Sequence, residues 1–422
     1  MNLEKLSIGI VGLGYVGLPL AAILSKKYNC VGFDISPQRV EELNDGFDRT
    51  GELSKGRLAQ LTGLTYTTDP SDLNYCNFFI VTVPTPVSSS NIPDFRPLKD
   101  ASKIIGEILK KGDIVVYEST VYPGATEEIC IPILERASGL TAINDFLYGY
   151  SPERINPGDV SNRVENIVKV TSGCNDYAAQ IIDGVYSSVI IAGTFKAASV
   201  RVAEAAKVIE NAQRDVNIAF MNQISLIFEK LDINTADVLA AAATKWNFLP
   251  FSPGLVGGHC IGVDPYYLIA KSEEVGCDPG LLKVSRAINE GMSAHIVARI
   301  KKFLVYEDRP LSALILGATF KEDCPDLRNS KVKELHELLM LEAFECSVID
   351  PVADEGEMRL YYGDSIDVPS KQFDVVILAV PHEHFFVGNH LVYEDRVRSG
   401  GLIFDVKSRL KSTMDGVTLF QL

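Results

Sequence analysis

The sequence predicts an α/β protein in which two doubly wound domains are joined by a long central helix in a helical middle domain. Two observations carry this prediction. Short apolar strands alternate with helical patterns in the first third of the chain and again in the last third. Between them, residues 197–231 contain no proline or glycine and carry apolar residues at helical spacing. We therefore expect Rossmann-like domains over 1–197 and 304–422, and a central helical domain over 198–303.

The composition is that of an ordinary globular protein. Of 422 residues, 46% are hydrophobic and 23% are charged, and the chain is too long for a single core. The net charge of -15 argues against nucleic acid or an anionic membrane as the main partner. We find no signal peptide and no apolar run near the ~20 residues that span a bilayer. The eight cysteines lack paired CxxC spacing, which argues against structural zinc or a disulfide framework and favours a reducing cytoplasm.

The first element is an apolar strand over 6–11 that runs into a glycine-rich turn, and a helical pattern follows. Strand, GxGxxG and helix in this order form a pyrophosphate site, because the glycines permit a tight turn and the helix amides face the anion. A second strand, 30–34, ends in Asp34, whose carboxylate suits ribose hydroxyls and would repel a 2′-phosphate. The residues expected to bind NAD here are Gly12, Gly14, Tyr15, Val16, Gly17 and Asp34, with Arg39 near the adenosine.

The next strands end in loops that carry polar residues. The apolar run 77–83 leads to Thr85, and the run 113–118 leads to Thr120. Ligands of a doubly wound sheet lie beyond the carboxyl ends of its strands, so both threonines are expected at the cofactor and substrate crevice, with plain turn and cap chemistry as the alternative. In a later loop, Glu153 and Arg154 are either a surface pair or an acid/base group beside an anion clamp.

The central helix carries a polar group of its own. Lys207 and Asn211 are four residues apart and share a face of the helix, and Arg214 lies close to that face. The alternative is that this is a solvated helix face without a functional role. After the helix, a segment with the single tryptophan, Trp246, favours either the wall of a substrate pocket or a core aromatic cluster.

The chain is organised around residues 254–265, where Cys260 and Asp264 lie four residues apart among four glycines and next to Pro265. A buried inert thiol would sit among apolar neighbours on a regular element, and this one does not. Cys260 is therefore a candidate reactive group, against the alternative of a glycine-rich turn that happens to carry a cysteine. His259 adjoins it, but successive residues usually project apart, so we expect His259 to be a plain loop residue.

The last third repeats the βα pattern with strands expected over 311–317, 346–350, 374–381 and 401–405. Its first turn lacks GxGxxG, so it is not expected to bind a whole dinucleotide in the same way. His382 and His384 could form a metal pair, but no third ligand is evident, and we predict no metal site.

Together these motifs resemble the UDP-sugar 6-dehydrogenase family, which contains UDP-glucose, GDP-mannose and UDP-N-acetylhexosamine dehydrogenases. The matching segments follow one another along the whole chain: GLGYVG, VPTP, ESTVYPG, SPERINPG, AEAAKVIEN, GGHCIGVDP and an FKxDxxDxR stretch at 320–328. The chain looks most like the UDP-N-acetylglucosamine and galactosamine 6-dehydrogenases of capsule and O-antigen synthesis, including the Vi-antigen type. Ser252 stands where those relatives usually carry a basic residue, while Pro157 in place of a second glutamate fits an N-acetylated sugar.

The resemblance implies oxidation of the sugar C6 hydroxyl to a carboxylate by two NAD. It makes Cys260 the nucleophile and Lys207 the cation that stabilises developing oxyanions, with Asn211 as its hydrogen-bonding neighbour. Asp264 with Thr120 would hold a water for proton transfer or hydrolysis, and Glu153 would be the assisting acid/base. It also implies a homodimer built on the central helices and an active site between the terminal domains. Arg328 is expected on NAD, and the residues expected on the UDP-sugar are Arg154, Ile155, Lys207, Asn211, Arg214, Lys245, Asn247, Gly257, Phe320 and Lys321.

Three alternatives stay open at this point. The substrate could be UDP-glucose or UDP-ManNAc. The enzyme could be a two-electron dehydrogenase of the hydroxyacid type, which needs the lysine but no thiol. The chain could also be an NAD-binding regulator without turnover.

Overall fold

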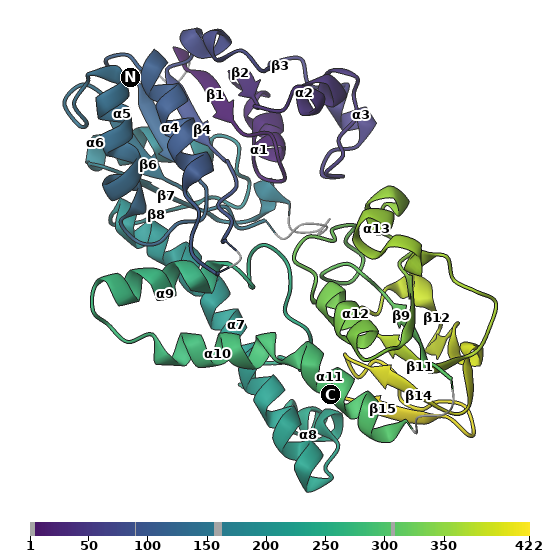
Figure 1. Cartoon of the computed structure of the whole chain (residues 1–422). Helices are drawn as coiled ribbons and strands as arrows, with labels where there is room; N and C mark the ends of the chain where they lie inside the picture. Colours follow the sequence, from purple (N-terminus) through teal and green to yellow (C-terminus); the bar gives the residue numbers. More distant parts are fainter. Residues whose placement is uncertain (1–4, 89, 156–162, 305–308) are drawn as a thin grey trace. The chain divides into compact units, whose positions relative to one another are not determined.

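The computed structural model describes residues 5–88, 90–155, 163–304 and 309–422 (Figure 1). The chain forms two compact units, Met1–Glu210 with Tyr266–Cys277, and Asn211–Pro265 with Asp278–Leu422. Helix α7 (Val200–Leu231) contributes residues to both. Each unit contains a largely or wholly parallel sheet, so the predicted α/β class is confirmed. The domain boundaries expected at 197 and 303 stay a prediction.

The first unit is built on a sheet with the order β3-β2-β1-β4-β5-β6-β7-β8. Its strands are parallel except for the antiparallel pair β6–β7. The strand order reverses at β1, which is where ligands bind in such sheets. The strands are β1 (Ser7–Val11), β2 (Asn29–Phe33), β3 (Leu64–Thr67), β4 (Phe78–Val81), β5 (Ile114–Tyr117), β6 (Leu147–Tyr150), β7 (Lys169–Gly173) and β8 (Thr194–Lys196).

Helices cover both faces of this sheet, as alternate residues of one strand show. Ile114 and Val116 of β5 pack in a core with residues of α1 and α6, whereas Val115 and Tyr117 pack with α4 and α5. This burial on both faces explains the continuous apolar runs in the sequence. The helices are α1 (Gly17–Leu24), α2 (Pro37–Asn44), α3 (Lys55–Leu58), α4 (Arg96–Ile108), α5 (Ile131–Ser138) and α6 (Asp176–Ser187), with short turns at Pro70–Tyr75, Thr126–Cys130 and Val164–Asn166.

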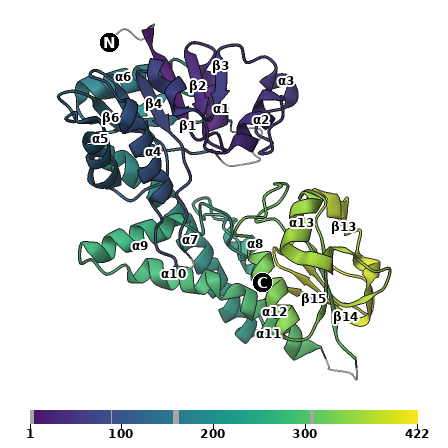
Figure 2. The ribbon, with the colours of Figure 1, turned by 45° about the horizontal axis from the view of Figure 1, so that its top comes forward.

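The second unit holds a parallel sheet with the order β10-β9-β11-β14-β15. Residues of α11, α12 and α13 form the core on one of its faces (Figure 2). The strands are β9 (Ser312–Leu316), β10 (Glu345–Ile349), β11 (Phe373–Leu378), β14 (Val397–Asp405) and β15 (Thr418–Gln421), with a hairpin of β12 (Phe386–Val387) and β13 (His390–Leu391). The helices are α8 (Thr235–Ala242), α10 (Gly280–Glu290), α11 (Met292–Phe303), α12 (Lys331–Leu341) and α13 (Glu355–Tyr362), with short turns at Gly363–Ile366, Glu383–Phe385 and Glu394–Arg396, and α9 (Asp264–Glu274) begins in this unit.

Candidate active site

The glycine-rich turn after β1 is closed on its inner side and open on its outer side. Gly12 has φ +98°, and a Cβ on Gly17 would lie 1.9 Å from the Gly12 carbonyl oxygen. A Cβ on Gly14 would meet nothing within 4 Å. The Leu13 amide donates to Asp34 Oδ2 at 2.9 Å, which joins the turn to the end of β2. The turn therefore leaves room for a pyrophosphate above Gly14.

Arg39 supports this turn from inside the protein. The side chain is buried, with the residue 5% exposed. Its Nε donates to the Leu13 carbonyl at 2.8 Å, and its guanidinium lies 2.8 Å from Asp48. The structure thus gives Arg39 a bracing role, and its proximity to an adenosine stays a prediction.

Lys207 and Asn211 on α7 are buried, so the interpretation of them as a solvated face is wrong, whereas Arg214 is exposed. Lys207 and Asn211 are 7% and 6% exposed. Glu204, one turn earlier, accepts hydrogen bonds from the Gly124 amide at 2.6 Å and the Thr126 amide at 2.9 Å. Burial raises the pKa of Glu204 to about 6. These bonds attach the loop after β5, which carries the half-buried Thr120, to α7, which carries Lys207. Thr85, in the loop after β4, is also half-buried.

Glu153 belongs to a buried charge cluster that sequence reasoning missed. Lys169 Nζ lies 2.6 Å from Glu118 Oε2 and 3.3 Å from Glu153 Oε2, and it donates to the Pro152 carbonyl at 3.1 Å. Tyr186 donates its hydroxyl to Glu118. Burial alone would lower the pKa of Lys169, but the two carboxylates raise it. Lys169 is therefore a buried cation that fixes one oxygen of Glu153.

The residues after Glu153 are held by the chain around them. The Arg154 and Ile155 amides donate to Glu153 Oε1. The Arg154 guanidinium lies 2.9 Å from Glu210 of α7 and donates to the Val168 carbonyl at 2.9 Å. Pro157, which bears on the choice of sugar, lies outside the described residues.

The loop that carries Cys260 is folded tightly against its own unit. The Gly258 amide donates to the Asn329 carbonyl at 3.1 Å, and Gly258 has φ +82°. A Cβ on Gly257 would lie 2.7 Å from that same carbonyl oxygen, so substrate contact at Gly257 stays a prediction. The Asp264 amide donates to the Cys260 carbonyl at 2.8 Å, which places Cys260 one turn before Asp264 at the start of α9. Cys260 itself is half-buried.

Asp264 is brought together with two predicted residues of α7. The residue is 1% exposed and accepts a hydrogen bond from the Asn211 side-chain amide. Arg214 donates to the Asn211 side-chain oxygen at 3.2 Å. Asn211 therefore links a carboxylate and a guanidinium that the sequence places 50 residues apart.

The expectation that His259 projects away from Cys260 is wrong. Its Nδ1 lies 3.3 Å from Cys260 Sγ, and its Nε2 lies 3.4 Å from Asp326 Oδ2. Successive side chains diverge along an extended strand, but this segment is a tight turn, in which they can converge. Burial opposes the charged imidazole, yet the contacts with Asp326 and Cys260 raise the pKa of His259 to about 9.

This raised pKa has a testable effect on stability. Protonation of His259 favours the fold fully below the ordinary histidine pKa of about 6.5, and the contribution is lost as pH rises through about 9. We expect the difference in unfolding midpoint between the wild type and His259→Gln to be largest near pH 6 and to shrink toward pH 9.5. Circular dichroism of the unfolding transition reports the midpoint. A difference that grows with pH over this range would contradict the assignment.

Asp326 in turn is held by Arg328. The Arg328 guanidinium makes two contacts with the carboxylate, Nε at 2.9 Å and Nη2 at 2.7 Å, and its backbone amide donates at 3.0 Å. Phe320 packs against Gly258 and lies 5.9 Å, between ring centres, from His259. The contacts predicted for Arg328 with NAD and for Phe320 with the sugar nucleotide stay predictions.

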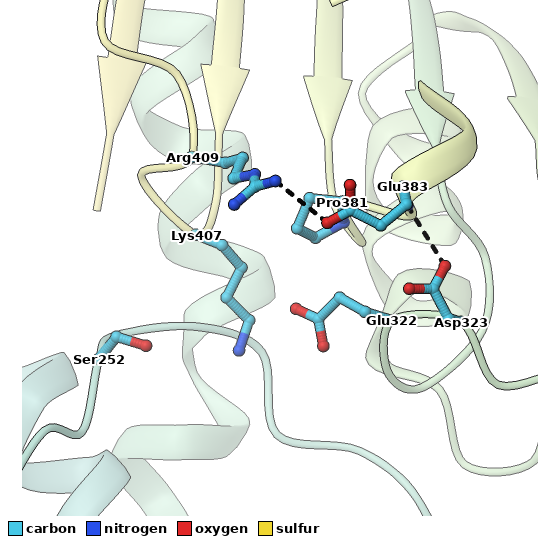
Figure 3. A pocket seen from close by; sticks show the side chains of 7 residues that line it. All are labelled: Ser252, Glu322, Asp323, Pro381, Glu383, Lys407 and Arg409. Atoms are coloured by element: carbon cyan, nitrogen blue, oxygen red, sulfur yellow. Dashed lines mark hydrogen bonds and ion pairs between the residues drawn. The ribbon is translucent and has the colours of Figure 1, made fainter. Parts of the chain in front are cut away.

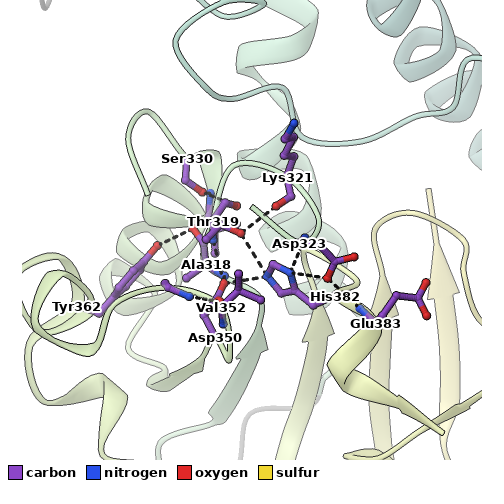
Figure 4. Close-up of polar contacts among 12 residues, drawn as sticks. Ala318, Thr319, Lys321, Asp323, Ser330, Asp350, Val352, Tyr362, His382 and Glu383 are labelled. Carbon is purple, nitrogen blue, oxygen red and sulfur yellow. Dashed lines mark hydrogen bonds and ion pairs between the residues drawn. The ribbon is translucent and has the colours of Figure 1, made fainter. Parts of the chain in front are cut away.

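The first turn of the second sheet resembles that of the first sheet but is occupied by protein (Figure 4). Asp350 Oδ2 accepts from the Ala318 amide at 2.7 Å, as Asp34 does from Leu13. Unlike Asp34, Asp350 also pairs with His382 Nε2 at 2.9 Å, and both side chains are 0% exposed. Burial would raise the pKa of Asp350, but His382 and backbone amides lower it to about 2. This carboxylate is therefore not available to a ribose, while the Lys321 side chain points away from it (Figure 4).

A pocket of about 300 Å³ lies beyond the carboxyl ends of β11 and β14 (Figure 3). Ser252 is at its edge, and the cations that line it are Lys407 and Arg409. Lys407 packs on the Ser252 loop, since a Cβ on Gly254 would lie 3.1 Å from its Nζ. Arg409 is paired with Glu383 at 3.0 Å. A cation is therefore present beside Ser252, but it is the side chain of Lys407 and not a residue at position 252.

The segment before Ser252 is exposed. Lys245 and Asn247 are exposed, and Trp246 is 92% exposed, so the interpretation of Trp246 as a core residue is wrong. The roles of Lys245 and Asn247 toward a substrate stay predictions.

Comparison with known protein families decides the identity of the fold. Residues 6–190 match the NAD binding domain of the UDP-glucose/GDP-mannose dehydrogenase family, residues 201–291 match its central domain, and residues 314–412 match its UDP binding domain. The chain belongs to this family. It is an NAD-dependent nucleotide-sugar dehydrogenase, and the resemblance and the cofactor predicted from its motifs are confirmed.

Individual relatives are similar along nearly the whole chain. CapL of Staphylococcus aureus is 49% identical over 411 residues, 96% of this chain and 96% of that protein. UDP-N-acetyl-D-glucosamine 6-dehydrogenase of Pseudomonas aeruginosa is 50% identical over 388 residues, 91% and 92% of the two chains. The solved structure of UDP-D-ManNAc dehydrogenase from Pyrococcus horikoshii matches with a TM-score of 0.87 at 28% identity and covers 98% of both chains.

Two kinds of feature are absent from the described residues of the dehydrogenase. No cluster of three or more histidine, cysteine or acidic side chains there is arranged to hold a metal. None of the described helices combines the length and apolar character that a membrane crossing requires.

The glycine turn of this dehydrogenase permits a matched pair of variants. Gly17→Ala is expected to cost about 1–3 kcal/mol of folding stability, because its Cβ would overlap the Gly12 carbonyl. Gly14→Ala should leave the unfolding temperature unchanged and weaken NAD binding roughly tenfold, or about 1.4 kcal/mol, because its methyl group enters the space left for the cofactor. Thermal unfolding and NADH fluorescence titration measure the two effects. Equal changes in unfolding temperature and in NAD affinity for the two variants would refute the conclusion that the turn is packed at Gly17 and open at Gly14.

Proposed function

We propose that the chain oxidises the C6 hydroxyl of a UDP-N-acetylhexosamine, UDP-GlcNAc or UDP-GalNAc, to the carboxylate with two NAD. The observation that carries this proposal is the 50% identity to an enzyme named UDP-N-acetyl-D-glucosamine 6-dehydrogenase over nine-tenths of both chains. A second relative of the same name, from Salmonella typhi, is 49% identical. The match to the family's UDP binding domain supports a UDP-linked substrate.

The reaction requires the sugar to stay on the protein between two oxidations. NAD, when bound at the glycine turn, would supply the hydride acceptor for each of them, and the first oxidation also releases the proton of the C6 hydroxyl to solvent. After the first, the Cys260 thiolate adds to the C6 aldehyde, and the carbonyl electron pair moves onto oxygen. Loss of the second hydride from this thiohemiacetal leaves a thioester. Water then adds, the Cys260 thiolate leaves, and two protons pass to solvent as the carboxylate forms.

The other predicted residues have roles that suit their chemistry. Lys207 supplies a buried cation for the developing oxyanions, with Asn211 as its hydrogen-bonding neighbour on α7. Asp264 and Thr120 hold the water that cleaves the thioester, and Glu153, fixed by Lys169, assists proton transfer. Gly12, Gly14 and Asp34 hold NAD, for which the open turn above Gly14 and the carboxylate at the end of β2 are suited.

UDP-ManNAc is the second candidate substrate, because relatives named for it are 31–32% identical and one has a solved structure with a TM-score of 0.87. Assays with UDP-glucose, UDP-GlcNAc, UDP-GalNAc and UDP-ManNAc test the choice. We expect the highest kcat/KM for UDP-GlcNAc or UDP-GalNAc. Preference for UDP-ManNAc or UDP-glucose would overturn the assignment. The resemblance to capsule and O-antigen enzymes supports a cytoplasmic role in the synthesis of a surface polysaccharide.

We also propose a homodimer, as the resemblance implies. Five exposed apolar residues lie on one face of α7, at spacings of seven, eleven, seven and four residues: Val202, Ile209, Phe220, Ile227 and Leu231. Such a stripe on a long helix is typical of a surface covered by another chain.

The dimer is tested by mass in solution. Sedimentation should give twice the 46.2 kDa of the chain. Phe220→Asp combined with Ile227→Asp should shift the mass to that of the monomer, because burying two carboxylates in an apolar contact is unfavourable. Tyr75→Asp, at an exposed position of the first unit, is the control that should stay dimeric. A monomeric wild type would refute the proposal.

A further inference from the structure

The loop that carries Cys260 makes a series of side-chain contacts that have no role in the reaction proposed above. Cys260 Sγ lies 3.3 Å from His259 Nδ1, and His259 Nε2 lies 3.4 Å from Asp326. Asp326 is bound by the guanidinium and the backbone amide of Arg328. All four residues belong to the second unit. When the sulfur is a thiolate and the imidazole is protonated, the charge alternates along these four groups: negative sulfur, positive imidazolium, negative carboxylate and positive guanidinium.

The backbone around these residues fixes the arrangement. Gly258 has φ +82°, a conformation that favours glycine, and a Cβ there would lie 2.7 Å from the Phe320 ring. The Phe320 ring therefore packs directly on the residue before His259. The Asp326 side chain is 2% exposed and that of His259 29% exposed, so solvent screens the imidazole–carboxylate contact incompletely.

The charges around His259 favour its protonated form at neutral pH. The titratable or charged groups that act on it are Asp326, Cys260 and Arg328. Burial and Arg328 disfavour the imidazolium, while the contacts with Asp326 and Cys260 favour it, and the pKa of His259 is raised to about 9. Against the effect of burial, the contacts with His259 and Arg328 hold the pKa of Asp326 far below its usual range.

We propose that His259 pairs as an imidazolium with the thiolate of Cys260, and that Asp326 is the positioning residue that orients and charges the imidazole. This inference rests on the proposed function, in which Cys260 is the nucleophile. The sulfur electron pair forms the C–S bond to the aldehyde carbon, and the same pair returns to sulfur when the thioester is cleaved. No proton has to leave or reach the sulfur in either step, because the imidazolium stabilises the anion throughout.

The test measures sulfur reactivity without substrate. Full-length wild type, His259→Gln and Asp326→Asn are treated with iodoacetamide at pH 7, and peptide mass spectrometry follows each cysteine. An ordinary thiol is a few per cent thiolate at pH 7, so loss of the imidazolium should lower the fraction of Cys260 that is thiolate. A thiolate of higher pKa is more nucleophilic, which offsets part of this loss, and we expect alkylation of Cys260 to become about tenfold slower. Asp326→Asn should fall between the wild type and His259→Gln. Cys277, which is exposed, should react at one rate in all three proteins.

The buried cysteines 30, 76, 130 and 324 serve as internal reporters of folding, because they react only if the variant opens. Alkylation of Cys260 at the wild-type rate in a folded His259→Gln protein would overturn the inference. Failure of the proposed function gives a different pattern: a Cys260→Ser variant that still forms uronate removes the nucleophile's role whatever the alkylation rates are. The two failures are therefore distinguishable.

Discussion

Replacement of Cys260 by serine is expected to stop carboxylate formation, with a fall in turnover of at least about 10³-fold. A serine hydroxyl is almost wholly protonated at neutral pH, so it forms the covalent adduct far more slowly than a thiolate. The half-buried position of Cys260 in a tight turn leaves little freedom for another side chain of the loop to replace it. Release of UDP-uronate, followed by chromatography, is the measurement.

The chain offers a matched control for this substitution. Cys277→Ser changes an exposed cysteine shortly after α9 and should leave turnover unchanged. NAD binding by Cys260→Ser should also equal that of the wild type, because the glycine turn lies in the other unit. Uronate release by Cys260→Ser at more than a tenth of the wild-type rate would rule out the covalent route.

The second large effect is expected from Lys169→Met. This substitution removes the buried cation between Glu118 and Glu153 and leaves two carboxylates close together without a cation to balance them. Removing one partner of a buried ion pair typically costs about 3–5 kcal/mol. The first unit should therefore unfold at lower urea concentration, as reported by loss of NADH binding. Hydrogen exchange measured on peptides follows the second unit separately.

Two further variants separate this effect from a general loss of lysine. Lys111 makes an exposed pair with Asp145 at 3.0 Å, so Lys111→Met should change stability by less than about 1 kcal/mol. Glu118→Gln added to Lys169→Met should restore part of the loss, because it removes one unpaired carboxylate. Equal effects of Lys169→Met and Lys111→Met would contradict the assignment of a buried cluster.

Much of the fold follows from local sequence patterns. The runs around Ile80 and Val116 are continuous because both faces of their strands are buried, and that pattern predicted parallel strands at nearly the observed bounds. The glycine turn and Asp34 were predictable because each acts within a short segment. The antiparallel strand β7 was not predicted, since its direction depends on the connection before it, part of which lies outside the described residues.

The contacts that support the site could not be predicted because they join distant segments. Lys169 is the first residue of the short strand β7, and nothing near it in sequence shows that Glu118 and Glu153 converge on it. His382 was considered as a metal ligand, whereas its partner is Asp350, at the end of another strand. The expectation that the side chains of His259 and Cys260 project apart was wrong, because successive side chains diverge in an extended chain but can converge in a tight turn.

The central claim is that one enzyme carries out two successive oxidations on a sugar held by Cys260. The most direct measurement is the amount of NADH formed per UDP-GlcNAc consumed by the wild type, with a hydrazine present to trap free aldehyde. We expect two NADH per uronate and no trapped aldehyde. One NADH per sugar, or an aldehyde that leaves the protein and is trapped, would contradict it.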